Sequence, residues 1–237
     1  MDERRATDRL VAEQVRYYEE RAAEYDLLWR REGGCDLGPE RNEAWFRETA
    51  VVEASVDALA ERGSVLELAC GTGLWTRRLS AAAPRRLLAV DTSPAMLSLN
   101  REHTADPRIE YALADVFAWD PPSGERFDLI FMGFFMSHVP PDRFAGFWER
   151  LAEWLAPGGR VFLCDDRDGP GRPYSGEAVP AAPAFAHRRR LADGREYTIV
   201  KRFWSPEDLT AELDALGWDA DIRSSGREFL FGSVRPR

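Results

Sequence analysis

The sequence lacks most features that mark exported, membrane-spanning and metal-binding proteins. It has no run of about 18 or more apolar residues, so no transmembrane helix is expected. Residues 1–5 (MDERR) do not begin an apolar signal segment, which predicts no export and a cytoplasmic location. Three cysteines, an odd number without metal-ligand spacing, favour reduced structural thiols and no metal site. They are Cys35, Cys70 and Cys164.

Positive charge is scarce as well. The 32 basic residues are outnumbered by 41 acidic residues, which gives a net charge of -9. This balance disfavours nucleic acid and anionic membranes as partners. At 237 residues the chain can bury a substantial core, and one domain is the default. We therefore expect a single domain with a small-molecule partner, and the sequence makes no prediction about oligomeric state.

The most informative segment of the sequence is a strand, a glycine turn and a helix typical of an adenosine-binding site. The apolar run Val65–Leu68 predicts a strand covered on both faces of a parallel sheet. Gly71 and Gly73 let the backbone approach a ligand without a Cβ clash. Asp91 ends the next apolar run, near the offset of about 20 residues at which a second-strand carboxylate meets ribose hydroxyls.

Two residues distinguish this motif from a dinucleotide fingerprint. Thr76 stands where G-x-G-x-x-G requires its third glycine, so a pyrophosphate site is incomplete. Glu67 is unfavourable beside phosphates but favourable beside an ammonium or a sulfonium group. The segment from Glu67 to Gly73, ELACGTG, resembles the first motif of class I methyltransferases, which use S-adenosylmethionine. An NAD-dependent oxidoreductase is disfavoured, and a non-catalytic cofactor-binding subunit remains a further alternative.

Strand and helix patterns alternate along the chain and predict an α/β fold. They indicate a doubly wound, mostly parallel, seven-stranded sheet with an N-terminal helical cap. Ser205 followed by Pro206 predicts the capped start of a late helix. We divide the single domain into a cap (1–62), a cofactor-binding half (63–166) and an acceptor side (167–237). The expected strands are 64–69, 86–90, 109–113, 127–132, 160–164, 188–203 and 226–234, and the other expected helices are 11–30, 40–61, 74–82, 94–102 and 142–155.

The methyltransferase resemblance implies a set of cofactor-binding residues. Asp115, at the end of the third expected strand, would accept a hydrogen bond from the adenine amino group. Gly133 and Phe134, after the fourth strand, would contact the methionine part of the cofactor. Asp128 and the glycines of residues 155–161 are expected to be structural. The complete expected set is Glu67, Ala69, Cys70, Gly71, Gly73, Trp75, Asp91, Thr92, Met96, Asp115, Val116, Gly133 and Phe134.

Residues 187–202 reverse the acidic balance of the chain. Only Asp193 and Glu196 oppose six basic side chains, a pattern typical either of an anion site or of a solvated edge strand. Lys201 is the only lysine in the sequence, which favours a specific role for it. The six basic residues are Arg188, Arg189, Arg190, Arg195, Lys201 and Arg202.

The register of the hairpin in this stretch decides whether its cations converge. If residues 192–194 form the turn, Arg189 pairs with Tyr197 and shares one face with Lys201. If residues 193–194 alone form the turn, the register slips by one and the two cations point apart. The sequence leaves both registers open.

Four further segments carry a second resemblance: Ser137–Pro140, Phe147–Trp148, Asp193–Arg195 and Ile199–Lys201. They look like small-molecule O-methyltransferases of bacterial natural-product pathways, and among these most like phosphonate O-methyltransferases. The resemblance covers most of residues 14–235, with a departure expected in the loop 168–184. It implies that Tyr25, Arg189 and Lys201 hold the anionic group of the acceptor.

His138 and a group of aspartates have competing interpretations. His138 follows the fourth strand, where it could act as a base, bind an anion, or cap the turn at residues 140–142. Asp165, Asp166 and Asp168 could bind magnesium, but no further ligand is evident and we expect no metal.

We therefore expect methyl transfer to an anionic small molecule, a phosphonate or a carboxylate. Arg189 and Lys201 would orient an already ionised oxygen, which needs no strong base, and Tyr25 would close a lid. The alternative acceptor is a neutral hydroxyl or amine, for which His138 would be essential. The lid is expected because apolar residues recur on one face of the first helix: Val11, Val15, Tyr18, Ala22, Tyr25 and Trp29.

Overall fold

The computed structural model describes residues 2–59, 63–122, 124–167, 179 and 182–237. Within these residues, seven strands form one sheet in the order β3-β2-β1-β4-β5-β9-β8. β1 to β5 are parallel, and β9 is antiparallel to both of its neighbours, so the predicted fold class is confirmed. The strands are β1 (Ser64–Leu68), β2 (Arg86–Asp91), β3 (Ile109–Leu113), β4 (Phe127–Gly133), β5 (Leu155–Asp166), β8 (Trp218–Ser224) and β9 (Phe229–Pro236).

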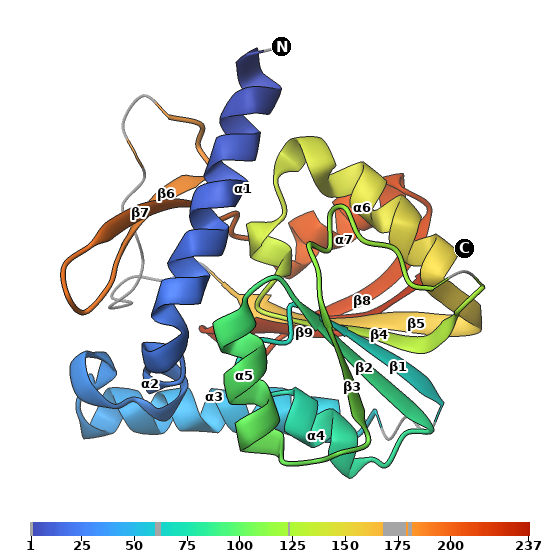
Figure 1. Cartoon of the computed structure of the whole chain (residues 1–237), viewed down its shortest axis with the longest axis horizontal. Helices are drawn as coiled ribbons and strands as arrows, with labels where there is room; N and C mark the ends of the chain where they lie inside the picture. The colour runs from blue at the N-terminus through green and yellow to red at the C-terminus, as the bar shows by residue number, and fades with distance from the viewer. Residues whose placement is uncertain (1, 60–62, 123, 168–178, 180–181) are drawn as a thin grey trace.

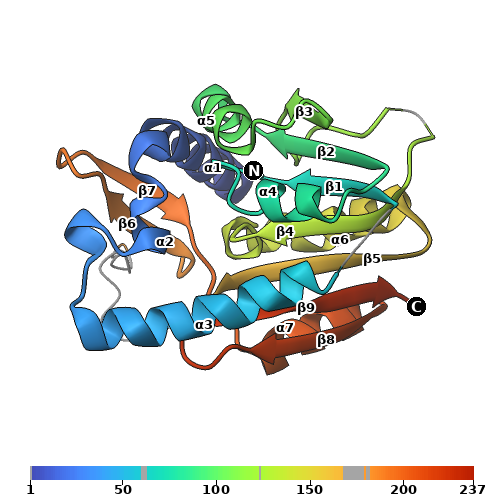
Figure 2. The same cartoon turned by 90° about the horizontal axis from the view of Figure 1, so that it is seen from below.

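Helices cover both faces of the sheet (Figures 1 and 2). β1 directs Val65 into a buried cluster with residues of α3, α4 and α5, and directs Leu66 into another with residues of α6 and α7. Burial on both faces explains why β1 is apolar almost throughout. The helices are α3 (Pro39–Asp57), α4 (Thr76–Ala81), α5 (Pro94–Thr104), α6 (Pro141–Trp154) and α7 (Pro206–Ala215).

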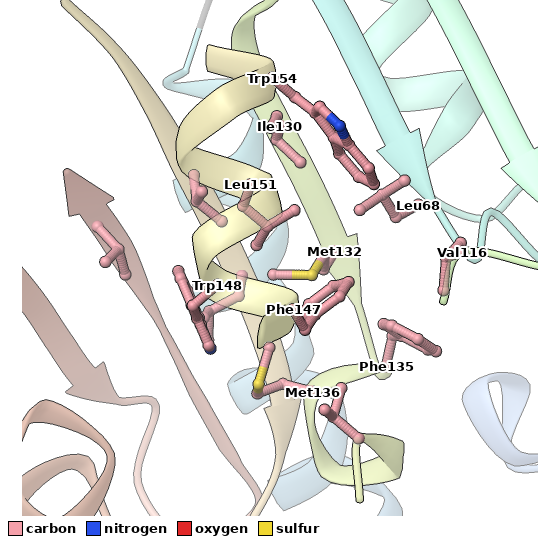
Figure 3. Close-up of a cluster of buried hydrophobic side chains, with 14 of the residues drawn as sticks. Leu68, Val116, Ile130, Met132, Phe135, Met136, Phe147, Trp148, Leu151 and Trp154 are labelled. Atoms are coloured by element: carbon pink, nitrogen blue, oxygen red, sulfur yellow. The ribbon is translucent and has the colours of Figure 1, made fainter. Parts of the chain in front are cut away.

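The packing of α6 on β4 holds the end of β4 in place (Figure 3). Phe147, Leu151 and Trp154 recur at helical spacing and share one buried cluster with Met132 of β4. Burying each such side chain contributes about 1.5–3 kcal/mol. The loop that leaves β4 therefore starts from a fixed point in the sheet.

The strand order places a ligand crevice between β1 and β4. The chain reverses the direction in which strands are added at this point, and in doubly wound sheets ligands bind there, beyond the carboxyl ends of the strands. The segments that follow β1, β2 and β4 form the walls of this crevice.

One expected strand of the sheet was wrong. Residues 188–203 do not join the large sheet but form a separate hairpin of β6 (Ala186–Arg190) and β7 (Glu196–Val200). The edge position of the large sheet, next to β9, is occupied by β8 instead. The sequence of β8 is WDADIRS. Its charged residues are typical of an edge strand, but they interrupt the alternation of apolar and polar residues that identifies a half-buried strand.

The structure confirms only some of the predicted helix ends. Ser205 caps α7 as expected, with its Oγ accepting the Asp208 N–H at 3.0 Å. α3 ends at Asp57, before the predicted end at residue 61, which lies outside the described residues. Residues 155–161, expected as a turn, already belong to β5, whose pairing with β4 shifts after Phe127.

The N-terminal cap is interrupted rather than a single helix, and it packs on the hairpin. α1 lies beside β7 (Figure 1), where the Thr198 N–H donates to Glu13 Oε1 at 2.7 Å and the Val200 N–H donates to Gln14 Oε1 at 3.1 Å. These bonds satisfy amides at the edge of the hairpin. None of the described helices combines the length and the apolarity needed to cross a membrane. The cap elements are α1 (Asp2–Arg21), η1 (Ala22–Glu24), α2 (Leu27–Arg30) and η2 (Gly33–Cys35).

Candidate active site

The turn between β1 and α4 has the backbone of a ligand-binding loop. Ala69, Gly71 and Gly73 adopt positive φ angles of 52°, 54° and 95°. A Cβ on Gly73 would lie 2.9 Å from Asn100 Oδ1, whereas no described atom lies within 4 Å of a Cβ built on Gly71. Gly73 is therefore required for packing against α5, and Gly71 leaves open space above the loop.

Asp91 closes this loop onto β2. Its Oδ2 accepts the Gly71 N–H at 2.9 Å and its Oδ1 accepts the Ser93 N–H at 2.9 Å. Burial raises the pKa of Asp91, although these backbone donors act in the opposite direction. Each carboxylate oxygen retains acceptor capacity, so the side chain can also accept hydrogen bonds from ribose hydroxyls, as predicted for it.

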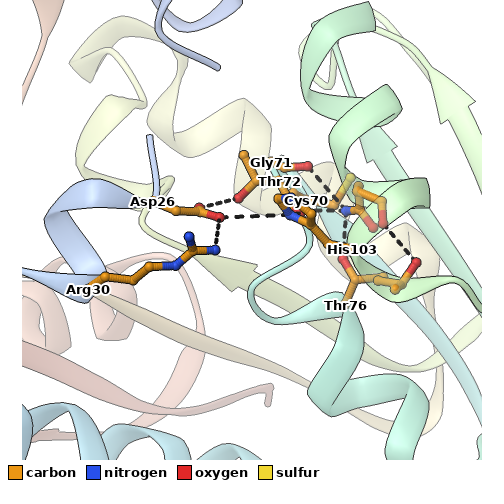
Figure 4. A network of polar contacts seen from close by, with 9 residues as sticks. Asp26, Arg30, Cys70, Gly71, Thr72, Thr76 and His103 are labelled. Atoms are coloured by element: carbon orange, nitrogen blue, oxygen red, sulfur yellow. Dashed lines mark hydrogen bonds and ion pairs between the residues drawn. The ribbon is translucent and has the colours of Figure 1, made fainter. Parts of the chain in front are cut away.

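A polar network behind the loop was not predicted (Figure 4). The buried amide of Asn100 donates to the Gly71 carbonyl at 3.2 Å and to Thr76 Oγ1 at 2.8 Å. On the outer side, Thr72 Oγ1 donates to Asp26 Oδ1 at 2.5 Å, and His103 Nδ1 lies 2.8 Å from the Thr72 carbonyl. Asn100 thus holds the loop from α5, and Asp26 ties the cap to it.

Glu67 is an acid buried without a full set of partners. Its side chain is hydrogen-bonded to Thr76, its Oε2 has no hydrogen-bond partner in the described structure, and only 1% of the residue is exposed. Burial raises its pKa to about 8. A buried carboxyl in this state suits a nearby ligand that carries positive charge.

A cavity of about 530 Å³ extends from this loop along the crevice. We call it the cofactor cavity. Seven of the thirteen predicted cofactor residues line it, together with Gln14, Val15, Tyr18, Tyr25, Phe135 and His138. The seven are Ala69, Gly71, Asp91, Thr92, Met96, Gly133 and Phe134.

The other predicted cofactor residues lie off the cavity wall. Glu67, Cys70 and Gly73 belong to the strand and loop behind it. Trp75 is in the core, with its ring centroid 5.8 Å from that of Phe131, and Val116 is likewise buried among core side chains. Asp115 is exposed and its Oδ1 accepts the Phe117 N–H at 2.9 Å, so its role toward adenine stays a prediction.

A second cavity of about 860 Å³, which we call the acceptor cavity, adjoins the first. Tyr18, Tyr25, Phe134 and His138 line both cavities and form the wall between them. The charged residues of the acceptor cavity are Arg21, Asp26, Arg31, Asp166, Arg189 and Lys201.

The hairpin register brings Arg189 into the acceptor cavity. Arg189 pairs with Tyr197, which confirms the three-residue turn. The side chain is buried, with 9% of the residue exposed, and burial lowers its pKa. Within the described part of the chain, no carboxylate pairs with Arg189 and its Nη1 has no hydrogen-bond partner. Its neighbours Arg188 and Arg190 are exposed and pair with Glu196.

Lys201 lies in the same cavity but its charge is balanced. Its Nζ donates to Ser137 Oγ at 2.7 Å and to Asp166 Oδ2 at 2.9 Å, and Asp165 Oδ1 is 3.6 Å away. These two aspartates balance the charge of Lys201. No group of three or more metal-ligating side chains occurs among the described residues. Asp168 of the magnesium hypothesis lies outside them.

His138 is neutral and its tautomer is fixed. Nδ1 lies 2.6 Å from the Val200 carbonyl, which can only accept, so Nδ1 carries the proton. Nε2 therefore accepts from the Tyr18 hydroxyl at 2.8 Å. Burial, together with the charge of Lys201, lowers the pKa of His138 well below its usual value. The interpretation of His138 as a cap of the turn at residues 140–142 is wrong, because the ring contacts the cap and the hairpin.

Tyr25 stands where the predicted lid meets the site. It lines both cavities, and the Arg21 guanidinium lies 5.1 Å from its ring centroid. Burial raises its pKa, so it remains a neutral phenol. The cap residues therefore do cover the crevice.

Comparison with known proteins decides the family. Residues 65–159 match the methyltransferase-domain family. The structure of DhpI with SAH is 35% identical in sequence, with a TM-score of 0.73, and the match covers 96% of this chain and 97% of DhpI. The chain belongs to the S-adenosylmethionine-dependent methyltransferases. An oxidoreductase is thereby excluded.

More relatives of this methyltransferase point the same way. A second DhpI structure, a complex with SAM and HEP, is 36% identical, with a TM-score of 0.75, over 96% of this chain and 98% of DhpI. The trans-aconitate 2-methyltransferase of Paracidovorax citrulli is 34% identical over 53% of this chain and 48% of its own length. The enzyme of the same name from Methylobacterium radiotolerans is 36% identical over 48% of this chain and 41% of its own length. The match thus spans less than half the length of these two relatives.

S-adenosylmethionine is the cofactor of the methyltransferase. The described residues fit it, since the space above Gly71 is open and Asp91 offers a carboxylate at the end of β2. Glu67, behind the cavity wall, has an oxygen with no hydrogen-bond partner among the described residues, and its carboxyl suits the positive charge of the sulfonium and ammonium groups.

Proposed function

We propose that this methyltransferase methylates an anionic oxygen, a phosphonate or a carboxylate, of a small molecule. Arg189 is the observation that carries the proposal. Among the described residues no carboxylate pairs with this buried guanidinium, which is costly unless a ligand compensates it, and the guanidinium lines the acceptor cavity, next to the cofactor cavity. Charge-assisted bonds from arginine to phosphonate or carboxylate oxygens supply that compensation.

The residues of the site bind and orient rather than move a proton. S-adenosylmethionine, when bound, supplies a methyl group that leaves its sulfonium sulfur as the acceptor oxygen forms the new O–C bond. Arg189 holds the anionic group of the acceptor, and Lys201 neutralises Asp166 so that this carboxylate does not repel it. Phe134 and Tyr25 fill the wall between the cavities and exclude water.

The state of His138 disfavours the alternative of a neutral hydroxyl or amine acceptor. A base must hold the proton it removes, and His138 would then become an imidazolium in a buried site near Lys201 and Arg189. An ionised oxygen has no proton to lose, so a neutral histidine is no disadvantage for it.

The relatives support the same class of acceptor. Two of them are named for trans-aconitate, which is a carboxylate. A natural-product pathway and a cytoplasmic location stay predictions from the sequence.

An acceptor panel tests the proposal. Phosphonates, carboxylates, alcohols and amines of similar size are incubated with the enzyme and S-adenosylmethionine, and products are scored by mass spectrometry for a gain of one methyl group. We expect methyl esters of phosphonates or carboxylates. Methylation of alcohols or amines alone would overturn the proposal and restore His138 as a base.

A further inference from the structure

Tyr18 and His138 form a hydrogen-bonded pair in the wall shared by the two cavities. Tyr18 was not among the expected site residues. It comes from α1, whereas His138 comes from η3 (Met136–His138) after β4. The bond therefore joins the cap to the segment after β4 in the wall between the cofactor cavity and the acceptor cavity.

The direction of this hydrogen bond is fixed by the backbone of Val200. Because His138 is neutral and its one ring proton is on Nδ1, bonded to the Val200 carbonyl, Nε2 can only accept, and the Tyr18 hydroxyl must donate. Burial keeps the pKa of Tyr18 well above its usual value, so the phenol retains this proton. Having donated its only proton, the Tyr18 oxygen has lone pairs alone to offer to a ligand.

The backbone N–H and the backbone carbonyl of Val200 both take part in this arrangement and close it into a circuit of hydrogen bonds. The Val200 N–H donates to Gln14, one turn before Tyr18 on α1, and the Val200 carbonyl accepts from His138. Hydrogen bonds thus run from Gln14 through Val200 and His138 to Tyr18, and α1 completes the circuit. Tyr17, Tyr25 and His138 pack around the Tyr18 ring, with centroids 5.0, 6.1 and 5.2 Å away.

We propose that Tyr18 and His138 act as one positioning pair, in which neutral His138 holds the Tyr18 oxygen, lone pairs outward, at the junction of the two cavities. A lone-pair oxygen there attracts the electropositive methyl group of the cofactor, while Arg189 holds the acceptor from the other cavity. No proton is transferred in this role. The inference rests on the proposed function, and it makes His138 an orienting group rather than a base.

A double-mutant cycle tests the pair on the best acceptor that the panel yields. Tyr18→Phe removes the hydroxyl, and His138→Asn retains a donor for the Val200 carbonyl while removing the acceptor for Tyr18. We expect each variant to lower kcat about tenfold with little change in either KM, and the double variant to be no slower than the slower single one. Wild-type kcat should show no ionisation near pH 6.5.

Controls separate positioning from folding. Tyr17→Phe changes the adjacent tyrosine, which lines neither cavity, and should retain wild-type kcat. His138→Gln returns an acceptor oxygen at the Nε2 position and should recover part of the activity lost in His138→Asn. Thermal unfolding confirms that each variant is folded.

Three results would overturn the inference: an unchanged kcat in Tyr18→Phe, multiplicative losses in the double variant, or an inactive His138→Asn beside a near-normal Tyr18→Phe. The last result would identify His138 as a base. Failure of the anion proposal in the acceptor panel is a separate outcome, because the cycle measures kcat whatever the class of acceptor.

Discussion

The Thr72 hydroxyl donates to the carboxylate of Asp26 at 2.5 Å, which fastens the N-terminal cap to the cofactor loop. Hydrogen bonds to charged groups contribute about 1.5–3 kcal/mol, so the contact is strong enough to help hold the cap against the loop. Closure of such a segment excludes water from the reaction.

Loss of this contact is expected to loosen the cap. Asp26→Ala should accelerate amide hydrogen exchange across residues 11–30 and raise the KM for S-adenosylmethionine roughly tenfold. Thr72→Val should reproduce both effects, because it removes the other partner. Arg30→Ala removes an exposed partner of Asp26 and should have little effect. Unchanged exchange in Asp26→Ala would mean that the cap is a fixed packing element.

Asp91 is expected to be the main side-chain contact to the cofactor ribose. Asp91→Ala removes a charged acceptor, so the affinity for S-adenosylmethionine should fall ten- to hundredfold, about 1.5–3 kcal/mol, by isothermal titration. Asp219→Ala is the matched comparison, since Asp219 of β8 is exposed and lines neither cavity. A folded Asp91→Ala enzyme with normal affinity would remove this residue from the site.

Substitutions at Gly71 and Gly73 should impair the protein in different ways, one through cofactor binding and the other through stability. Gly73→Ala forces a Cβ to within 2.9 Å of Asn100 and a side chain into φ of 95°, so it should destabilise the fold by about 1–3 kcal/mol. Gly71→Ala also forces a side chain into a positive φ, of 54°, but its Cβ meets no described atom within 4 Å, so it should chiefly weaken cofactor binding while costing less stability than Gly73→Ala. Urea unfolding and cofactor titration of both variants measure the two effects. Equal losses of stability would contradict the distinction.

Glu67 should give the protein a pH-dependent stability. Its pKa of about 8 in the folded state exceeds the ordinary value, so between about pH 5 and pH 8 the folded chain retains a proton that the unfolded chain has released. Stability from this group is complete at low pH and is lost as the pH rises through 8. Glu67→Gln should therefore gain thermal stability over the wild type as the pH rises across this window.

Cofactor binding should reverse the protonation of Glu67. A cationic ligand nearby favours the ionised carboxyl, so binding of S-adenosylmethionine near pH 7 should release a proton. Titration calorimetry in buffers of different ionisation enthalpy detects that proton, and Glu67→Gln should abolish the release. Identical proton counts in wild type and variant would show that Glu67 does not respond to the cofactor.

The cofactor half was predictable because local sequence determines its geometry. Gly71 needs a positive φ and Asp91 must end the second strand, and both requirements appear directly in the sequence. Asn100 and Tyr18 were missed, because a polar or aromatic residue on a helix face gives no local sign that it reaches a loop many residues away. Their partners are set by helix packing.

The acceptor side was less predictable for the same reason. The sequence left two hairpin registers open, and the structure has the one that buries Arg189, with α1 packed on β7. Lys201 carried the same expectation as Arg189, but its pairing with Asp166 depends on how the end of β5 meets the hairpin. Two cations with equal sequence signals therefore differ in the described structure: Lys201 pairs with a carboxylate and Arg189 does not.

The most direct test compares two adjacent arginines of β6. Arg189→Gln removes a buried cation that pairs with no carboxylate among the described residues, whereas Arg190→Gln removes an exposed cation that pairs with Glu196. We measure KM for the anionic acceptor, the affinity for S-adenosylmethionine and thermal stability. The account predicts that Arg189→Gln raises the acceptor KM roughly ten- to hundredfold, leaves cofactor affinity unchanged and does not lower the stability of the free protein, while Arg190→Gln resembles the wild type. An unchanged acceptor KM in Arg189→Gln would contradict the anion site.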